Sequence, residues 1–214
     1  MSDAERDITA RLRGLGTRRT PEAIEAELLQ LAPAPSARLT SEDLLEVFLA
    51  RLRHNGGTAG VVADRAAAVG EIAAHIASRQ PQRRFVAGHD PRLAALPWRD
   101  GGLLPRFGAA EDGDRVAVSW ARCAIAESGS LALWVERSNP AVNNLLCDDH
   151  VVLVDRADIR RSLEDLWSDP VLRDADRRPR GLMLISGPSS TADIAMQLVL
   201  GAHGPRSLHA VVLA

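Results

Sequence analysis

Residues 58–87 read TAGVVADRAAAVGEIAAHIASRQPQRRFVA, and this stretch decides the fold class. Its first five residues have the composition of a short strand. Asp64 then caps a helix in which Val69, Ile72 and Ile76 recur on one face, and residues 84–87 form a second strand. A strand, a helix and a strand in close succession make a βαβ unit. The sequence therefore predicts a parallel sheet with a right-handed crossover.

The same alternation continues toward the C-terminus. Short apolar runs predict strands at residues 116–119, 124–127, 131–135, 150–154, 182–186 and 208–213. Helices are predicted after Asp155 and over residues 191–203. Residues 89–114 are rich in Gly, Pro and Asp and are predicted to form a long loop, with or without a short helix, that covers a site. The chain is therefore predicted to be an α/β protein with a mostly parallel sheet.

The N-terminal part shows helical patterns only. Thr20 before Pro21 marks a helix start, because a hydroxyl caps the free amides and proline suits the first helical position. A second helix is predicted to begin at Thr40, with Asp43 completing a capping box, and to end at residues 55–57, Asn-Gly-Gly. We therefore predict a helical lead-in of residues 1–55 and one α/β domain of residues 56–214.

Composition excludes several classes of function. The formal net charge is −2 and the sequence pI is about 6.3, so the chain has no excess of positive charge to attract a nucleic acid. It contains no lysine, which excludes a Schiff-base lysine and a Walker lysine. Its apolar runs are far shorter than the ~20 residues that cross a bilayer. The first 13 residues carry charges and lack the apolar core of a signal peptide, so a cytoplasmic location is expected.

The two cysteines, Cys123 and Cys147, are too few and too far apart for the usual metal centres. An iron–sulfur cluster bound by one chain usually takes about four thiolates, and a structural zinc site takes a comparable set. We predict that both are buried, reduced thiols and that the chain holds no metal. The run Asp148-Asp149-His150 contains metal-ligand types, but adjacent strand residues point to opposite faces.

The segment LISGPSSTADI, residues 184–194, is the first candidate site. A buried strand is predicted to end at Ser186, Gly187 makes a turn, and Ser190 with Asp193 caps the next helix. Backbone amides and hydroxyls would then gather at a helix N-terminus, which favours a carboxylate or a phosphate. The candidate ligand-binding residues are Ser186, Gly187, Ser189, Ser190, Thr191 and Asp193. A well-capped helix that binds no ligand remains the alternative.

The segment AIAESGSL, residues 124–131, is the second candidate site. Glu127 stands at a strand end beside Ser128, Gly129 and Ser130, where it could act as a general base or bind a polar substrate. The alternative is a tight hairpin in which the serines and the glycine serve the turn. His203 and His209 are assigned capping or core roles in preference to metal ligation.

These two segments, together with LVLGAHGPRSLH at residues 198–209, resemble the signature motifs of the lactate utilization protein C family, also called the LUD-domain family. The resemblance covers roughly residues 55–214. It implies a three-layer α/β/α fold like that of sugar-phosphate isomerases and CoA transferases. It also implies a role in oxidising L-lactate to pyruvate, alongside partner proteins that carry iron–sulfur clusters. Because this chain shows no flavin, nicotinamide or cluster motif, it is expected to need such redox partners.

The sequence departs from the family pattern at two positions. Ser128-Gly129-Ser130 stands where Thr-Gly-Thr is common, which keeps both hydroxyls. Ser190 stands where the family often has Arg, so Arg122 or Arg206 would have to supply a cation to an anion site. Two alternatives to the accessory role stay open. One is a regulatory module that binds a small carboxylate, and the other is an acyl- or CoA-transferase-like enzyme with Glu127 as its catalytic carboxylate.

Overall fold

The computed structural model describes residues 10, 20–30, 39–191, 199–201 and 203–214, and it divides the chain into two compact units, residues 1–35 and 36–214. In the first unit, helix α2 (Pro21–Gln30) begins after Thr20, whose Oγ1 accepts a hydrogen bond from the amide of Ala23. The predicted helix start is confirmed. Every residue of α2 is exposed, including the apolar Ile24 and Leu28.

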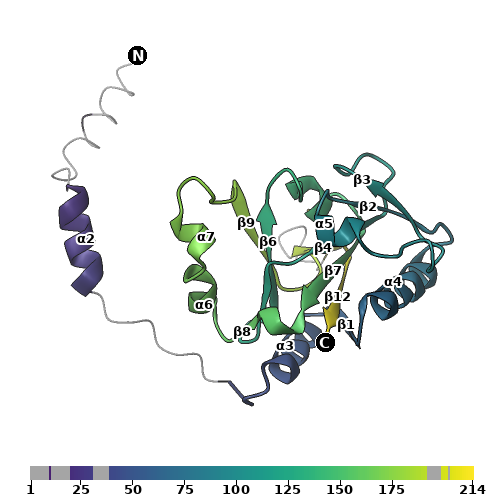
Figure 1. The fold of residues 1–214 in the computed structure, drawn as a ribbon, viewed down its shortest axis with the longest axis horizontal. Helices are drawn as coiled ribbons and strands as arrows, with labels where there is room; N and C mark the ends of the chain where they lie inside the picture. Colours follow the sequence, from purple (N-terminus) through teal and green to yellow (C-terminus); the bar gives the residue numbers. More distant parts are fainter. Residues whose placement is uncertain (1–9, 11–19, 31–38, 192–198, 202) are drawn as a thin grey trace. The chain divides into compact units, whose positions relative to one another are not determined.

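The second unit is built on a six-stranded parallel sheet (Figure 1). In spatial order its strands are β1 (Thr58–Val62), β12 (Ser207–Leu213), β7 (Asp149–Asp155), β4 (Val116–Trp120), β2 (Arg84–Ala87) and β3 (Leu104–Phe107). The strands predicted as one βαβ unit are thus parallel members of one sheet, but three other strands lie between them. The predicted α/β class with a mostly parallel sheet is confirmed.

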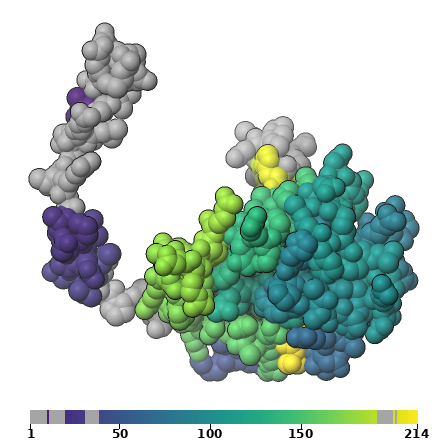
Figure 2. Space-filling view, turned by 45° about the horizontal axis from the view of Figure 1, so that its top comes forward, coloured from purple at the N-terminus to yellow at the C-terminus, as the bar shows by residue number. Residues whose placement is uncertain are grey.

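Strand β12 crosses the middle of this unit and is buried along its whole length. In the space-filling view the C-terminal segment, coloured yellow, comes to the surface in two separate places (Figure 2). Alternate residues of β12 belong to two different apolar clusters, with Val211 in one and Val212 in the other. Because alternate strand residues point to opposite faces, the sheet is covered on both sides.

Helix α4 (Arg65–Arg79) covers one face of the parallel sheet through Val69, Ile72 and Ile76, and α5 (Pro91–Ala94) adds Leu93 to the same cluster. Asp64 caps α4, as predicted, by accepting a hydrogen bond of 2.8 Å from the amide of Ala67. Helix α3 (Leu44–His54) packs against the opposite face through Val47, Phe48 and Leu52. It therefore belongs to the same compact unit as the sheet, although it lies N-terminal to the boundary predicted at residue 55.

A second, four-stranded sheet lies on the same side as α3 and was not predicted as a separate layer. Its order is β8 (Ile159–Arg160), β5 (Cys123–Ile125), β6 (Ser130–Val135) and β9 (Gly181–Ile185). One face packs on the parallel sheet, and the other packs against α6 (Leu163–Trp167) and α7 (Pro170–Arg173). Strand β9 was predicted as a buried strand, but it is only partly buried, and Leu184 is 42% exposed.

Several local predictions were wrong. Asp43, rather than Thr40, caps α3 by accepting from the amides of Leu45 and Glu46. The helix predicted after Asp155 is replaced by the 3₁₀ turn η2 (Arg156–Asp158), strand β8 and α6, because residue 159 pairs with β5. The loop predicted over residues 89–114 does contain a short helix, α5, but it also contains strand β3, which was not predicted.

The helix predicted over residues 191–203 is also contradicted where the structure describes it. Strands β10 (Ser190–Thr191) and β11 (Val199–Leu200) form an antiparallel pair there. Residues 192–198, including Asp193, and residue 202 lie outside the described residues. Ser190 therefore does not cap a helix.

Candidate functional site

The two candidate segments meet in space through their serine hydroxyls. Strands β6 and β9 pair antiparallel with Leu131 opposite Ile185, which brings Ser130 beside Ser186. The Oγ atoms of Ser128 and Ser130 are 2.7 Å apart, and those of Ser130 and Ser186 are also 2.7 Å apart. We call these three side chains the hydroxyl chain. Two hydrogen bonds use two of its three protons, so one proton of the hydroxyl chain is left to donate.

The C-terminal end of α3 closes over the hydroxyl chain. Asn55, which caps this end, donates from Nδ2 to the carbonyl oxygen of Ser128 over 2.9 Å. A Cβ atom at Gly129 would lie 2.5 Å from the amide nitrogen of Leu52, and one at Gly187 would lie 2.3 Å from the carbonyl oxygen of Asn55. Both positions therefore need glycine, because no side-chain carbon fits against that backbone.

The electrostatics of this place differ from the prediction. An anion site was predicted from a helix N-terminus at Ser190, but Ser190 and Thr191 form strand β10. The helix end beside the hydroxyl chain is the C-terminus of α3, which carries the negative end of the dipole. The last turn of α3 also contains the basic residues Arg51 and Arg53.

The other predicted ligand residues lie outside the hydroxyl chain. The amide of Ser189 donates to the carbonyl oxygen of Pro205, and Thr191 pairs with β11. The guanidinium of Arg122 holds Asp169 with two nitrogens, at 2.8 and 2.7 Å. The Nε of Arg206 is 3.7 Å from Asp148. Both candidate replacement cations are thus next to carboxylates of the chain itself.

Glu127 contacts the first residue of helix α6. Its Oε1 accepts a hydrogen bond of 2.8 Å from the amide of Leu163, the first residue of α6. The first amides of a helix have no partner within it, so the carboxylate replaces one missing backbone acceptor. This contact ties the β5–β6 turn to α6. It favours a structural role over a catalytic one for Glu127.

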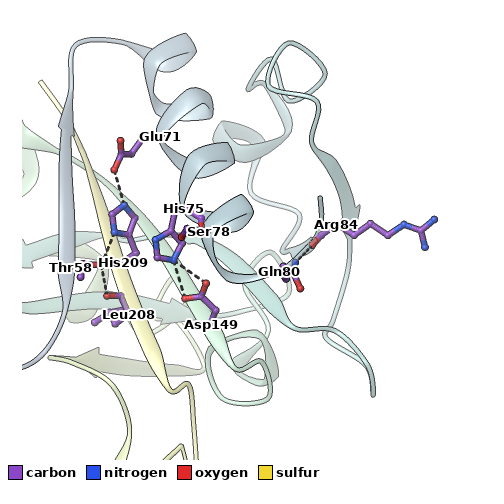
Figure 3. A network of polar contacts seen from close by, with 9 residues as sticks. All are labelled: Thr58, Glu71, His75, Ser78, Gln80, Arg84, Asp149, Leu208 and His209. Atoms are coloured by element: carbon purple, nitrogen blue, oxygen red, sulfur yellow. Dashed lines mark hydrogen bonds and ion pairs between the residues drawn. The ribbon is translucent and has the colours of Figure 1, made fainter. Parts of the chain in front are cut away.

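A histidine network at the amino ends of β1, β12 and β7 was missed by sequence reasoning (Figure 3). The rings of His75 and His209 stack, with their centres 4.2 Å apart and 16° between their planes. His75 donates from Nε2 to Oδ2 of Asp149 over 2.9 Å. His209 has Nδ1 2.8 Å from Oγ1 of Thr58. His75 carries no local sequence signal of this contact, since its partners are 74 and more residues away.

A second buried polar group lies on the other face of the parallel sheet. Nε2 of His150 is 3.0 Å from Oγ of Ser119, which in turn contacts Oδ1 of Asn144 at 3.2 Å. Nδ1 of His150 has no hydrogen-bond partner in the described part of the chain. Burial lowers the pKa of His150 to about 4, so its ring is neutral near pH 7.

The described residues offer no group of three or more His, Cys, Asp or Glu side chains placed to hold a metal ion. The thiols of Cys123 and Cys147 are 2% and 1% exposed and belong to separate apolar clusters. Burial raises the pKa of Cys123 to about 11 and that of Cys147 to about 12. Both are therefore neutral thiols near pH 7, and a cluster ligand must be a thiolate.

Fold and site together define an α/β protein in which a parallel sheet packs on a smaller mixed sheet. Residues 114–213 match the family model of the LUD domain. The crystal structure of a DUF162 family protein from Deinococcus radiodurans has the same fold, with a TM-score of 0.59 at 21% identity, over 83% of this chain and 100% of that chain.

Curated relatives agree with the domain match. A lactate utilization protein C from Macrococcus caseolyticus is 25% identical over 202 residues, which are 88% of this chain and 86% of that protein. An uncharacterized protein of Neisseria meningitidis is 38% identical over 96 residues, 45% of this chain, and a lactate utilization protein C from Exiguobacterium is 29% identical over 92 residues, 42% of this chain; each match covers 40% of the relative. Residues 114–213 thus match the LUD domain, and most of the chain is similar to a protein named lactate utilization protein C.

Proposed function

We propose that this protein is a component of a lactate utilization system and that it works with iron–sulfur proteins which oxidise L-lactate to pyruvate. The similarity to lactate utilization protein C over 88% of the chain carries the proposal. In the described residues no helix is long and apolar enough to cross a membrane. We place the protein and its partners in the cytoplasm.

The two thiols of this chain support the assignment of the iron–sulfur clusters to its partner proteins. Electron transfer through an iron–sulfur cluster needs about four thiolate ligands. Cys123 and Cys147 are the only cysteines of the sequence, and each is a buried, neutral thiol in its own apolar cluster. Residues placed in this way suit packing rather than ligation. We therefore assign no redox cofactor to this chain and expect the clusters in its partners.

The test is purification of the tagged full chain from cells grown on L-lactate, followed by iron analysis and a lactate-to-dye electron-transfer assay. We expect iron-containing proteins to purify with the chain and lactate oxidation to need both. A chain that oxidises lactate alone contradicts the proposal. So does a deletion strain that grows on lactate as well as the parent. A deletion strain complemented with the wild-type gene is the control.

A second candidate function, binding of a small carboxylate, is favoured by the hydroxyl chain. Ser128 and Ser186 can accept and donate hydrogen bonds at its ends, and Arg51 and Arg53 in the last turn of α3 supply positive charge. Calorimetric titration with L-lactate and pyruvate tests it. The double variant with Arg51→Gln and Arg53→Gln should abolish the heat of binding. Arg83→Gln is the control, because Arg83 is exposed and lies outside α3, and it should leave the heat of binding unchanged.

The third alternative, a transferase that uses Glu127, has less support in this geometry. A carboxylate that attacks an acyl group needs a free oxygen directed at the substrate. Oε1 of Glu127 is engaged with the amide of Leu163, and the predicted partner hydroxyls of Ser128 and Ser130 bond to each other.

A further inference from the structure

The stacked pair of His75 and His209 joins helix α4 to the parallel sheet. His75 stands one turn after Glu71 on α4, and His209 lies on β12, near the amino end of that strand. Their side chains are 8% and 6% exposed. Figure 3 shows the two rings between the helix and the strands, with acidic partners at the outer side of each ring.

The polar contacts of this pair involve four elements. His75 of α4 donates to Asp149 of β7, and His209 of β12 contacts Thr58 of β1. Nε2 of His209 lies 3.2 Å from Oε1 of Glu71, an ion-pair distance without good hydrogen-bond alignment. Apolar residues of α4 also pack on the sheet, and the histidine pair adds a polar connection between the helix and the strands.

Two imidazoles stacked at 4.2 Å cannot both carry a charge in a site with so little water. The charged groups that face the pair are Glu71 and Arg79 from α4 and Asp149 from β7; β1 offers the uncharged Thr58. Desolvation, followed by the nearness of His75, lowers the pKa of His209 to about 4, and the two carboxylates only partly oppose this. An imidazole released into water recovers a pKa of 6.5. A lower pH therefore stabilises any state in which α4 has moved away from the sheet and the ring of His209 is in water.

We propose that the His75–His209 pair is an acid-sensitive latch that holds α4 on the sheet near pH 7 and holds it more weakly near pH 5. The release also changes a binding surface. Arg79 and Gln80, at the end of α4, line a cavity of about 480 Å³ together with Asp148 and Asp149. Movement of the helix end alters this cavity wall, so the latch links the shape of the cavity to the acidity of the surroundings.

Hydrogen–deuterium exchange of the full chain at pH 7.5 and pH 5.0 tests the latch, with rates corrected for the intrinsic pH dependence of exchange. For one histidine with a pKa of about 4 in place and 6.5 when released, this change of pH raises the opened population by about 30-fold. We expect protection of residues 65–79 to fall by about that factor. Residues 116–120 in β4 should remain better protected than residues 65–79 at both pH values.

His209→Gln removes the titrating ring but keeps a polar side chain, so the acid-induced loss of protection over residues 65–79 should disappear. His75→Gln removes the ring beside His209 but not the burial of His209, so the acid-induced loss should become smaller without disappearing; this variant is the second test if His209→Gln does not fold. His150→Gln is the matched control, because His150 is also buried and belongs to the other face; the acid effect on α4 should persist in it. Protection of residues 65–79 as high as that of residues 116–120 at pH 5.0, no change in α4, or an unchanged response in both latch variants would each overturn the proposal.

Discussion

The Oγ atoms of Ser130 and Ser186 are 2.7 Å apart, although the two residues are separated by 56 positions in the chain. The antiparallel pairing of β6 with β9 creates this contact, and the turn at Gly129 extends it to Ser128. The hydroxyl chain thus connects the two most distinctive sequence motifs of the protein. Its contribution to the folded state can be measured apart from any contribution to ligand binding.

Ser130→Ala should lower the free energy of unfolding by about 1–2 kcal/mol, because it leaves two hydroxyls without their shared partner. Ser130 is only 4% exposed, so water does not readily replace the lost contacts. Urea denaturation monitored by circular dichroism measures the change. Ser78→Ala, at an exposed helical serine, is the control and should change the free energy by less than about 0.5 kcal/mol. Equal effects at both positions would mean that the hydroxyl chain adds no stability.

Glu127→Ala should lower the free energy of unfolding by about 1 kcal/mol, because the amide of Leu163 loses its acceptor. Glu127→Gln keeps an amide oxygen at the same place and should retain most of the stability. The pair separates structure from catalysis. If Glu127→Gln is as stable as the parent chain but loses activity in the lactate assay, the carboxylate has a chemical role that this hydrogen bond does not explain.

The strands were predictable from sequence because their apolar runs are short and continuous, as in β7 and β12. Two helices were predicted wrongly because residues within them pair with other strands. Ile159 and Leu163 have helical spacing, yet residue 159 pairs with β5, and Thr191 pairs with β11. Local periodicity carries no information on such partners, and tertiary pairing overrides it.

The candidate site was predictable only in its parts. Ser128, Ser130 and Ser186 could be singled out because each follows or precedes a strand beside a glycine. Their contact depends on the register of β6 against β9, which the local sequence does not specify. The histidine latch could not be predicted from the sequence, since its four elements are brought together by the order of the strands in the parallel sheet.

Both cysteine thiols should resist modification in the folded protein. Cys123 and Cys147 are nearly buried, and their pKa values are raised to about 11 and about 12, so the reactive thiolate is scarce at pH 8. We expect Ellman's reagent to react with neither thiol in the native chain during the first minutes, and with both in guanidinium. Rapid reaction of one native thiol would show that its cluster opens readily and would weaken the argument against ligation.

Stability should fall as the pH drops, and His150 accounts for part of the slope. Its folded-state pKa of about 4 lies below the unfolded value of 6.5, so the unfolded chain binds more protons between these values. The contribution is complete above pH 6.5 and is lost as the pH falls toward 4. Between pH 7.5 and pH 5 this amounts to about 2 kcal/mol. Urea titrations of the parent chain and His150→Gln at both pH values should show a smaller pH difference in the variant.

Gly129→Ala and Gly113→Ala form a matched pair that isolates the close approach of α3. Both glycines have positive φ, +68° and +93°, so alanine incurs a backbone cost of about 1 kcal/mol at either position. A Cβ at Gly113 would meet nothing within 4 Å, whereas one at Gly129 would lie 2.5 Å from the amide nitrogen of Leu52. Gly129→Ala should therefore be more destabilising than Gly113→Ala by about 2 kcal/mol or more in urea denaturation. Equal losses of unfolding free energy would mean that α3 can shift away from the β5–β6 turn without cost. The end of α3 would then not be held firmly against the hydroxyl chain.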